Sequence, residues 1–314
     1  MRDLRIVFMG TPDFAVTILE HLVTYNYNIV GVITAPDKPA GRGRKLNESS
    51  VKKYAVSQNL KVLQPTNLKS DDFIDELSKL KANLQIVVAF RMLPKVVWQM
   101  PEFGTFNLHA SLLPEYRGAA PINWAIINGE RKTGVTTFFI DDKIDTGEII
   151  LQKDVTIKED EIVGELHDRL MNLGAELVLE TIQLIEKDKV VTKKQPELEE
   201  KTAYKLFPDN CKIDWTDTLE NIYNKVRGLN PYPAAWTTIY NNDVETTAKL
   251  YSVSKEIFKH SEVIGTITTT KKTLKVAVKG GYLIVDEIKL SGKKKMNTQN
   301  LLNGYQFSSD AKMA

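Results

Sequence analysis

Three polar residues of the types that act in acyl transfer lie in or just after predicted strands. Asn107 and His109 belong to Thr105–Ala110, where the alternation predicts a strand with both side chains on one face of a sheet. An Asn amide can donate a hydrogen bond to an oxyanion, and His exchanges a proton near neutral pH. Asp145 follows another predicted strand, Val135–Ile140, and could orient the imidazole and favour its protonated form. The pattern fits acyl-transfer catalysis or a structural polar cluster.

The elements that must position these residues alternate between strands and helices through the first half of the chain. The fold class we predict is therefore α/β, with a Rossmann-like, mostly parallel sheet covered by helices on both faces. Because such sheets bind ligands at the carboxyl ends of their strands, a cleft is expected beside Asn107 and His109. Apolar runs predict strands at Leu4–Met9, Asn28–Ile33, Leu84–Phe90, Thr105–Ala110 and Val135–Ile140, and helical spacing predicts helices after Thr11-Pro12 and over 159–188.

The second half has a different texture. Polar and charged residues over 189–205 predict a linker, and a helix is expected over Leu219–Arg227. The short strands that follow predict a smaller, OB-like β-barrel. We therefore expect a catalytic domain at 1–188, a linker at 189–205 and a β-barrel domain at 206–314. The predicted barrel strands are Ala235–Ile239, Ala248–Val253, Ile264–Thr268, Thr273–Val278 and Tyr282–Ile288.

Composition excludes several classes of protein. With 42 Lys and Arg, 40 Asp and Glu and 42% hydrophobic residues in 314, the chain has the balance of a soluble globular protein, not a disordered one. Residues 1–190 carry 23 basic and 26 acidic side chains, whereas 191–314 carry 19 and 14, so the second part is mildly basic. No run approaches the ~20 apolar residues of a membrane span. The single cysteine, Cys211, predicts a reducing, cytoplasmic setting.

The turn after the first predicted strand argues against a nicotinamide cofactor. Gly10–Ala15 contains one glycine, and Asp13 stands where a phosphate would meet repulsion. Gly41–Gly43 is too short for a phosphate-binding loop. The acidic residues near Asp145 lack the glycine and glutamate spacing of a calcium loop, so no metal is expected.

Five stretches together resemble one family. They are Asn107–His109, Ser111–Ile122, Asp145–Gly147, Gly10–Ala15 and Pro36–Leu46. They resemble the signature of the formyl-tetrahydrofolate-dependent formyltransferases, and the resemblance covers nearly the whole chain. It implies transfer of a formyl group from 10-formyltetrahydrofolate to the α-amino group of methionyl initiator tRNA.

The resemblance also implies roles for individual residues. The family's catalytic Asn, His and Asp fall on Asn107, His109 and Asp145. We expect Asn107 and a protonated His109 to stabilise the oxyanion. Asp145, through water, would help to move the amine's proton to the departing folate nitrogen.

The donor is expected against Ser111, Leu112, Leu113 and Pro114. One departure from the family's pattern is close by: Ala89–Pro94 lacks a glycine that relatives often have, and it is one residue shorter. This difference bears on the backbone contacts to the pterin ring.

Basic residues are expected to bind the tRNA. Asp37–Lys45 carries four basic residues and one acidic residue, which gives 4 − 1 = +3, and its Gly and Pro content predicts a mobile loop. Arg117 could contact a phosphate or pack at a helix start. The expected tRNA contacts are Lys38, Arg42, Arg44 and Lys45, with Lys271, Lys272 and Lys293–Lys295 as further candidates for neutralising phosphates.

Two other functions compete with this one. A folate-dependent formyltransferase that acts on a nucleotide-linked amino sugar would share the catalytic residues, but it needs neither the basic barrel nor Arg42. A non-catalytic tRNA-binding module would not need an intact Asn107, His109 and Asp145. A monomer without metal or NAD is expected.

Overall fold

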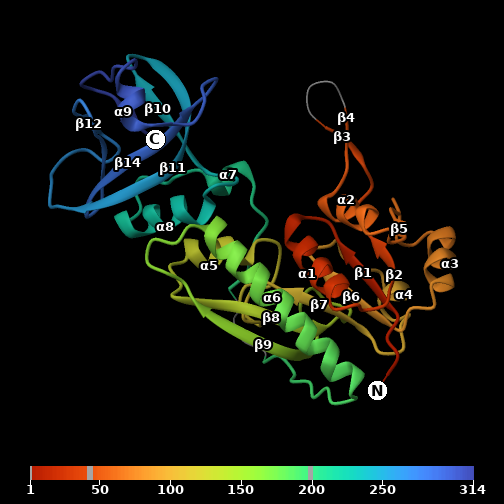
Figure 1. Ribbon diagram of the computed structural model, residues 1–314. Helices are drawn as coiled ribbons and strands as arrows, with labels where there is room; N and C mark the ends of the chain where they lie inside the picture. Colours follow the sequence, from red (N-terminus) through yellow and green to blue (C-terminus); the bar gives the residue numbers. More distant parts are fainter. Residues whose placement is uncertain (1, 41–44, 197–200) are drawn as a thin grey trace. The chain divides into compact units, whose positions relative to one another are not determined.

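The computed structural model describes residues 2–40, 45–196 and 201–314, and the chain forms two compact units (Figure 1). Two segments of the first half, Ala119–Thr133 and Thr156–Leu166, belong to the same unit as the barrel, an arrangement that hydrophobic periodicity does not reveal. Unit 1 contains Met1–Gly118, Gly134–Val155 and His167–Thr202, and unit 2 contains Ala119–Thr133, Thr156–Leu166 and Ala203–Ala314.

Unit 1 is built on a mostly parallel sheet, which confirms the predicted α/β class. β5, β2, β1, β6 and β7 run parallel in that spatial order, and β8 pairs antiparallel with β7. The strands are β1 (Ile6–Gly10), β2 (Ile29–Ile33), β5 (Val62–Leu63), β6 (Leu84–Val88), β7 (Thr105–His109), β8 (Lys132–Phe139) and β9 (Ile149–Thr156).

The register of this sheet fixes which side chains share a face. Met9 pairs with Val87, and Val87 pairs with Asn107, so these three side chains lie in one row across β1, β6 and β7. The neighbouring β7 residue Leu108 points to the opposite face, where a Cβ on Gly174 of α6 (Val163–Glu186) would lie 2.8 Å from it. The alternation predicted for β7 is therefore confirmed.

Helices cover this sheet. α1 buries Phe14, Ile18 and Leu22 as the spacing predicts, and its N-cap position is Pro12. Proline fixes the φ that this position tolerates and has no N–H to leave unpaired, so it begins the helix without a side-chain cap. The helices of this part are α1 (Asp13–Thr24), α2 (Ser50–Ser57), α3 (Asp71–Lys79), α4 (Lys95–Trp98) and α6 (Val163–Glu186), whose first residues belong to unit 2.

Unit 2 contains the predicted antiparallel barrel. Its path runs β12, β13, β14, β11, β10, β16, and a bridge between Thr266 and Lys312 brings the first strand back to the last. The strands are β10 (Ala235–Asn241), β11 (Val244–Ile257), β12 (Ile267–Thr269), β13 (Leu274–Val278), β14 (Gly281–Leu290), β15 (Met296–Asn297) and β16 (Lys312–Met313). The two-residue strands β15 and β16 are too short for a periodic pattern, so the sequence did not predict them.

The barrel core includes a helix face. α8 (Leu219–Leu229) buries Ile222 and Val226 among Val276, Leu283 and Ile288 of the strands. The remaining helices are α5 (Pro121–Ile127), α7 (Pro208–Cys211) and α9 (Thr298–Leu302). In the residues that the structure describes, no helix is long and apolar enough to cross a membrane.

The single cysteine reports on the integrity of this core. Cys211 is 3% exposed, and burial raises the pKa of its thiol. A disulfide-exchange reagent at about pH 8 should therefore react with the native protein at least about 100-fold more slowly than with the protein in urea. Absorbance of the released thiolate measures both rates. Equal rates would contradict the packing described for α7.

Candidate active site

β7 brings two of the three predicted catalytic residues to the same face of the sheet. His109 is 6% exposed, while Asn107 is half-buried. Phe106 and Leu108, on the other face, are buried and anchor the strand. The Asn107 amide makes no hydrogen bond to any part of the chain that the structure describes, so it can bind an incoming oxygen.

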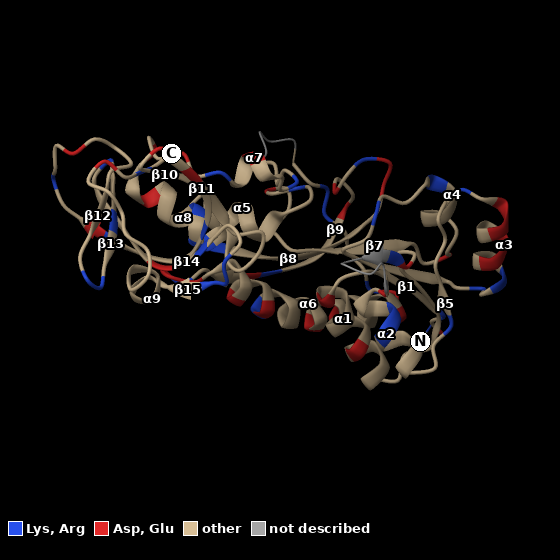
Figure 2. Ribbon diagram, turned by 90° about the horizontal axis from the view of Figure 1, so that it is seen from above, with Lys and Arg blue, Asp and Glu red and all other residues tan. Residues whose placement is uncertain are grey.

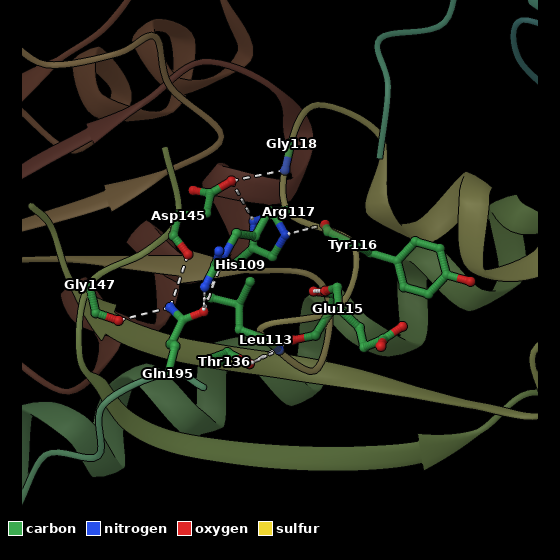
Figure 3. Close-up of polar contacts among 11 residues, drawn as sticks. His109, Leu113, Glu115, Tyr116, Arg117, Gly118, Thr136, Asp145, Gly147 and Gln195 are labelled. Carbon is green, nitrogen blue, oxygen red and sulfur yellow. Dashed lines mark hydrogen bonds and ion pairs between the residues drawn. The ribbon is translucent and has the colours of Figure 1, made fainter. Parts of the chain in front are cut away.

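The imidazole of His109 is held from two sides (Figure 3). Its Nε2 lies 2.9 Å from the carbonyl oxygen of Tyr116. A carbonyl can only accept, so Nε2 carries a proton and donates it. Its Nδ1 lies 3.8 Å from Oδ2 of Asp145. Nδ1 is therefore the ring nitrogen that faces the Asp145 carboxylate.

Asp145 lies in the segment that joins β8 to β9. Its Oδ2 accepts a hydrogen bond of 3.0 Å from the Gly118 backbone N–H, and its own backbone has a left-handed φ of 55°. Aspartate tolerates this conformation better than most residues. Two positions later, a Cβ on Gly147 would lie 1.6 Å from the Phe139 carbonyl oxygen, so this position needs glycine. Backbone geometry therefore favours aspartate at position 145 and glycine at position 147, in addition to any role of the carboxylate.

Gln195 is a residue of this site that the sequence did not single out. Its Nε2 donates to the carbonyl oxygens of Asp145 at 2.9 Å and Gly147 at 2.8 Å. Its Oε1 accepts from the Arg117 guanidinium at 2.5 and 3.1 Å. Arg117 thus hydrogen-bonds to Gln195, and its expected phosphate contact stays a prediction. Gln195 lies in the polar stretch predicted to be a linker, where nothing in the pattern marked it.

Thr136 on β8 supports the predicted donor segment from inside. Its hydroxyl donates to the Ser111 carbonyl at 2.7 Å and accepts from the Leu113 N–H at 3.2 Å. Gln152 reaches the same hydroxyl and the Leu113 carbonyl, both at 2.9 Å. The segment is therefore held at three backbone groups, the Ser111 carbonyl and the N–H and carbonyl of Leu113.

The four residues predicted to contact the donor divide into two kinds. Ser111 is fully buried and donates to the Glu115 carbonyl at 2.6 Å, and Leu113 is 3% exposed and packs with Phe138 and Ile149. Leu112 and Pro114 are half-buried. Leu112 and Pro114 therefore have partly exposed side chains, while Ser111 and Leu113 shape the turn.

The shortened segment after β6 has a distinct conformation. Ala89 takes a left-handed φ of 47°, a conformation that glycine adopts with less strain. Arg91 donates to the carbonyls of Pro65 and, at 3.0 Å, Thr66, which ties this segment to the chain after β5. Met92 is left 67% exposed.

The basic segment after β2 is anchored at its base. The expectation of a loop over Asp37–Lys45 is wrong for the two ends, which pair as β3 (Lys38–Ala40) and β4 (Lys45–Asn47). Asp37, just before β3, holds this end of the segment in place. It binds the Lys52 ammonium and accepts a hydrogen bond of 2.8 Å from Gln64. Those two hydrogen bonds, the Lys52 bond first, hold the pKa of Asp37 below its usual range. Lys38 is exposed, the backbone of Lys45 lies in β4, and Arg42 and Arg44 lie outside the described residues.

One of the acidic residues near Asp145, Asp141, accepts hydrogen bonds from its own loop. Asp141 accepts from the Thr146 hydroxyl at 2.7 Å and from the Lys143 N–H at 3.0 Å. Among residues 2–40, 45–196 and 201–314, no group of three or more His, Cys, Asp or Glu side chains is arranged to hold a metal ion.

Comparison with known proteins links this geometry to one chemistry. The family model "Formyl transferase" matches residues 4–182, and "Formyl transferase, C-terminal domain" matches residues 205–306. The methionyl-tRNA formyltransferase of Flavobacterium johnsoniae is 57% identical over 314 residues, 100% of both chains. That of Bacteroides thetaiotaomicron is 51% identical over 317 residues, 99% of this chain and 98% of the relative.

Solved structures share the fold at low identity. The sugar 3N-formyl transferase WlaRD, crystallised with dTDP and 5-N-formyl-THF, has a TM-score of 0.66 at 20% identity and covers 94% of this chain and 100% of its own. HypX from Aquifex aeolicus in complex with tetrahydrofolic acid has a TM-score of 0.64 at 16% identity and covers 96% of this chain and 47% of its own. These structures show the fold alone.

The hydroxyl of Thr136 provides a test of the donor segment. Thr136→Val would leave the Leu113 N–H and one Gln152 contact unpaired, so the free energy of unfolding should fall by about 1–3 kcal/mol. Thr133→Val is the matched control, because the Thr133 hydroxyl is buried without a hydrogen-bond partner in the described part of the chain. Urea unfolding measures both. Equal losses for the two variants would contradict the role given to Thr136.

Proposed function

Because the chain belongs to the formyl transferase family, we propose that it transfers the formyl group of 10-formyltetrahydrofolate to the α-amino group of methionyl initiator tRNA. Relatives of 51–59% identity along almost the entire chain support methionyl-tRNA as the acceptor. The amino-sugar alternative has support only from fold similarity at about 20% identity. The observation that carries the chemistry is the convergence of His109 and Asp145 beside the open amide of Asn107.

The reaction makes one demand above the others. A neutral α-amine attacks the formyl carbon, the new C–N bond forms, and the bond to the folate nitrogen breaks as that nitrogen takes the proton. An α-amino group titrates near ~7.7–8.0, so the free amine is available at neutral pH without a strong base. The protein must therefore stabilise the negative oxygen that develops on the formyl carbon.

Asn107 is suited to this oxygen. Its amide carries N–H donors, lies in the middle of the buried strand β7 and has no hydrogen bond to another described group. A donor fixed on a strand needs no reorganisation when the charge develops, and this makes it more effective than water. We assign the main oxyanion contact to Asn107.

His109 and Asp145 act together at Nδ1. The Tyr116 carbonyl accepts from Nε2, so a protonated Nδ1 supplies a positive charge that faces the reacting oxygen, in addition to the neutral amide of Asn107. At 3.8 Å, Asp145 Oδ2 stabilises the imidazolium without a direct hydrogen bond, and its side chain is 16% exposed. That exposure leaves space for a water, through which Asp145 passes the amine's proton toward the folate nitrogen.

The formyl donor fits the segment 111–114 in a specific way. 10-Formyltetrahydrofolate supplies the activated formyl group when it is bound. Leu112 and Pro114 offer half-exposed apolar surface for an aromatic ring, and Thr136 and Gln152 hold the backbone that carries them. Ser111 and Leu113 act from within the turn.

The acceptor's nucleic-acid part meets basic residues. Lys38 follows the parallel strand β2, whose carboxyl end lies at the same sheet edge as that of β7. Arg42, Arg44 and Lys45 come next in the sequence, and we assign all four residues to the tRNA. Lys and Arg of unit 2 are interleaved with Asp and Glu (Figure 2), and Lys295, for example, lies 2.8 Å from Glu287. The candidates in unit 2 for phosphate contact are Lys271, Lys272, Lys293 and Lys294. Lys295 is a further candidate, but its ammonium also binds the Glu287 carboxylate.

Several properties accompany this function. A methionyl-tRNA substrate places the protein in the cytoplasm, where translation begins. We also propose a monomer that needs neither metal nor NAD, with a catalytic domain at 1–188, a linker at 189–205 and a β-barrel domain at 206–314.

Formylation of methionyl initiator tRNA by 10-formyltetrahydrofolate tests the function and the site together. The wild type should formylate this tRNA, with elongator methionyl-tRNA as the comparison. Asn107→Ala should lower kcat about 10²–10³-fold because an oxyanion donor is lost, and His109→Ala at least about 100-fold. His21→Ala, on α1, should leave kcat unchanged. A His109→Ala rate within about tenfold of wild type, in a folded protein, would refute the assignment.

Salt dependence tests the tRNA contacts. The logarithm of the binding constant for methionyl-tRNA should fall linearly with the logarithm of salt concentration, with a slope of ~0.7–0.9 per neutralised phosphate. Replacing Lys38, Arg42 and Arg44 by Ala should make this slope shallower and raise KM for tRNA, with KM for the formyl donor unchanged. Filter binding over a salt series measures the slope. A flat response in the wild type would exclude phosphate contacts.

A further inference from the structure

We propose that Gln195, in the chain after α6, is a positioning residue that holds the catalytic carboxylate of Asp145 in place, a role that rests on the proposed function. Its side-chain amide binds both sides of the site at once. The donor half binds the Asp145 segment, and the acceptor half binds the Arg117 guanidinium next to Gly118 (Figure 3).

Both donors reach the backbone that carries the carboxylate. The Gln195 Nε2 contacts the carbonyls of Asp145 and Gly147, one residue on either side of Thr146. Asp145 has a left-handed backbone, which is held only when the surroundings fix it. Gln195 provides that restraint from the backbone side, while the Gly118 N–H provides it from the carboxylate side at 3.0 Å.

The accepting oxygen of the Gln195 amide connects this residue, through Arg117, to Gly118, the other group that holds Asp145. Gln195 Oε1 receives two hydrogen bonds from Arg117. Arg117 directly precedes Gly118, whose N–H binds Asp145 Oδ2. The amide therefore closes a ring that runs from Asp145 through Gln195 and Arg117 to Gly118 and back to Asp145. Displacement of any member shifts the distance between the carboxylate and His109.

Two further contacts keep this stretch of chain against unit 1. Lys193 exchanges backbone hydrogen bonds of 2.8 and 2.9 Å with Ile149 of β9. The Lys201 carbonyl accepts a hydrogen bond of 2.6 Å from the N–H of Tyr116, whose own carbonyl accepts the hydrogen bond from His109 Nε2. The described parts of 193–201 thus contact the peptide groups next to both charged catalytic side chains.

A glutamine suits this position better than its charged or apolar analogues. Glutamate could still accept from Arg117, but it has no N–H for the carbonyls of Asp145 and Gly147 and would place a negative charge against them. Methionine has nearly the same length but offers neither donor nor strong acceptor. The two substitutions therefore separate the donating half of the amide from its accepting half.

Steady-state formylation kinetics of Gln195→Ala, Gln195→Glu and Gln195→Met, with thermal unfolding of each, test this proposal. We expect kcat to fall about 10–100-fold in all three, with KM for both substrates within about threefold of wild type, because displaced catalytic groups slow chemistry rather than binding. Val191→Ala, 84% exposed in the same stretch, is the matched control and should match wild type.

A second measurement separates positioning from a general structural effect. In an Asp145→Ala background, Gln195→Met should change kcat by less than about twofold, because its effect acts through the missing carboxylate. A full multiplicative loss in that background would overturn the proposal, as would Gln195→Glu and Gln195→Met both keeping wild-type kcat. Wild-type protein that does not formylate methionyl-tRNA would refute the proposed function instead, and active wild type with unimpaired Gln195 variants would refute this inference alone.

Discussion

The hydrogen bond from His109 Nε2 to the Tyr116 carbonyl determines how the site can work. It fixes the proton on one ring nitrogen and leaves Nδ1 facing Asp145 Oδ2 at 3.8 Å. The imidazole can then be a cation that the Asp145 carboxylate stabilises, and a cation is suited to stabilise an oxyanion. The imidazole does not use the amide of Asn107 as a hydrogen-bond partner, so that amide stays available to the oxyanion. The neutral donor, Asn107, and the charged donor, His109, are thus separate groups that are held in place separately.

Backbone geometry, more than side-chain packing, maintains this arrangement. Tyr116 and Asp145 both take left-handed conformations, with φ of 61° and 55°. Such residues are common where surrounding contacts fix a functional group against local preference. Here the contacts come from the Gly118 N–H, from Gln195 and from the Lys201 carbonyl. The chain after α6 therefore contributes to the catalytic unit before it enters the barrel.

Strong periodic patterns made much of this structure predictable. The buried strands of unit 1, the face shared by Asn107 and His109, the face of α1 and the barrel follow from alternation and apolar spacing. The supporting contacts do not follow, because Gln195 and Thr136 act through distant backbone carbonyls and N–H groups that leave no local signal. The paired ends of the basic segment depend likewise on the contact of Asp37 with Lys52, 15 residues away.

The central claim concerns the protonation of one ring, and nitrogen NMR of histidine-labelled protein tests it most directly. The four histidines can be assigned with His109→Gln as reference. The account predicts that the neutral ring of His109 carries its proton on Nε2, as the hydrogen bond to the Tyr116 carbonyl requires. A neutral His109 with its proton on Nδ1 would contradict the account, because Nε2 could not then donate to Tyr116.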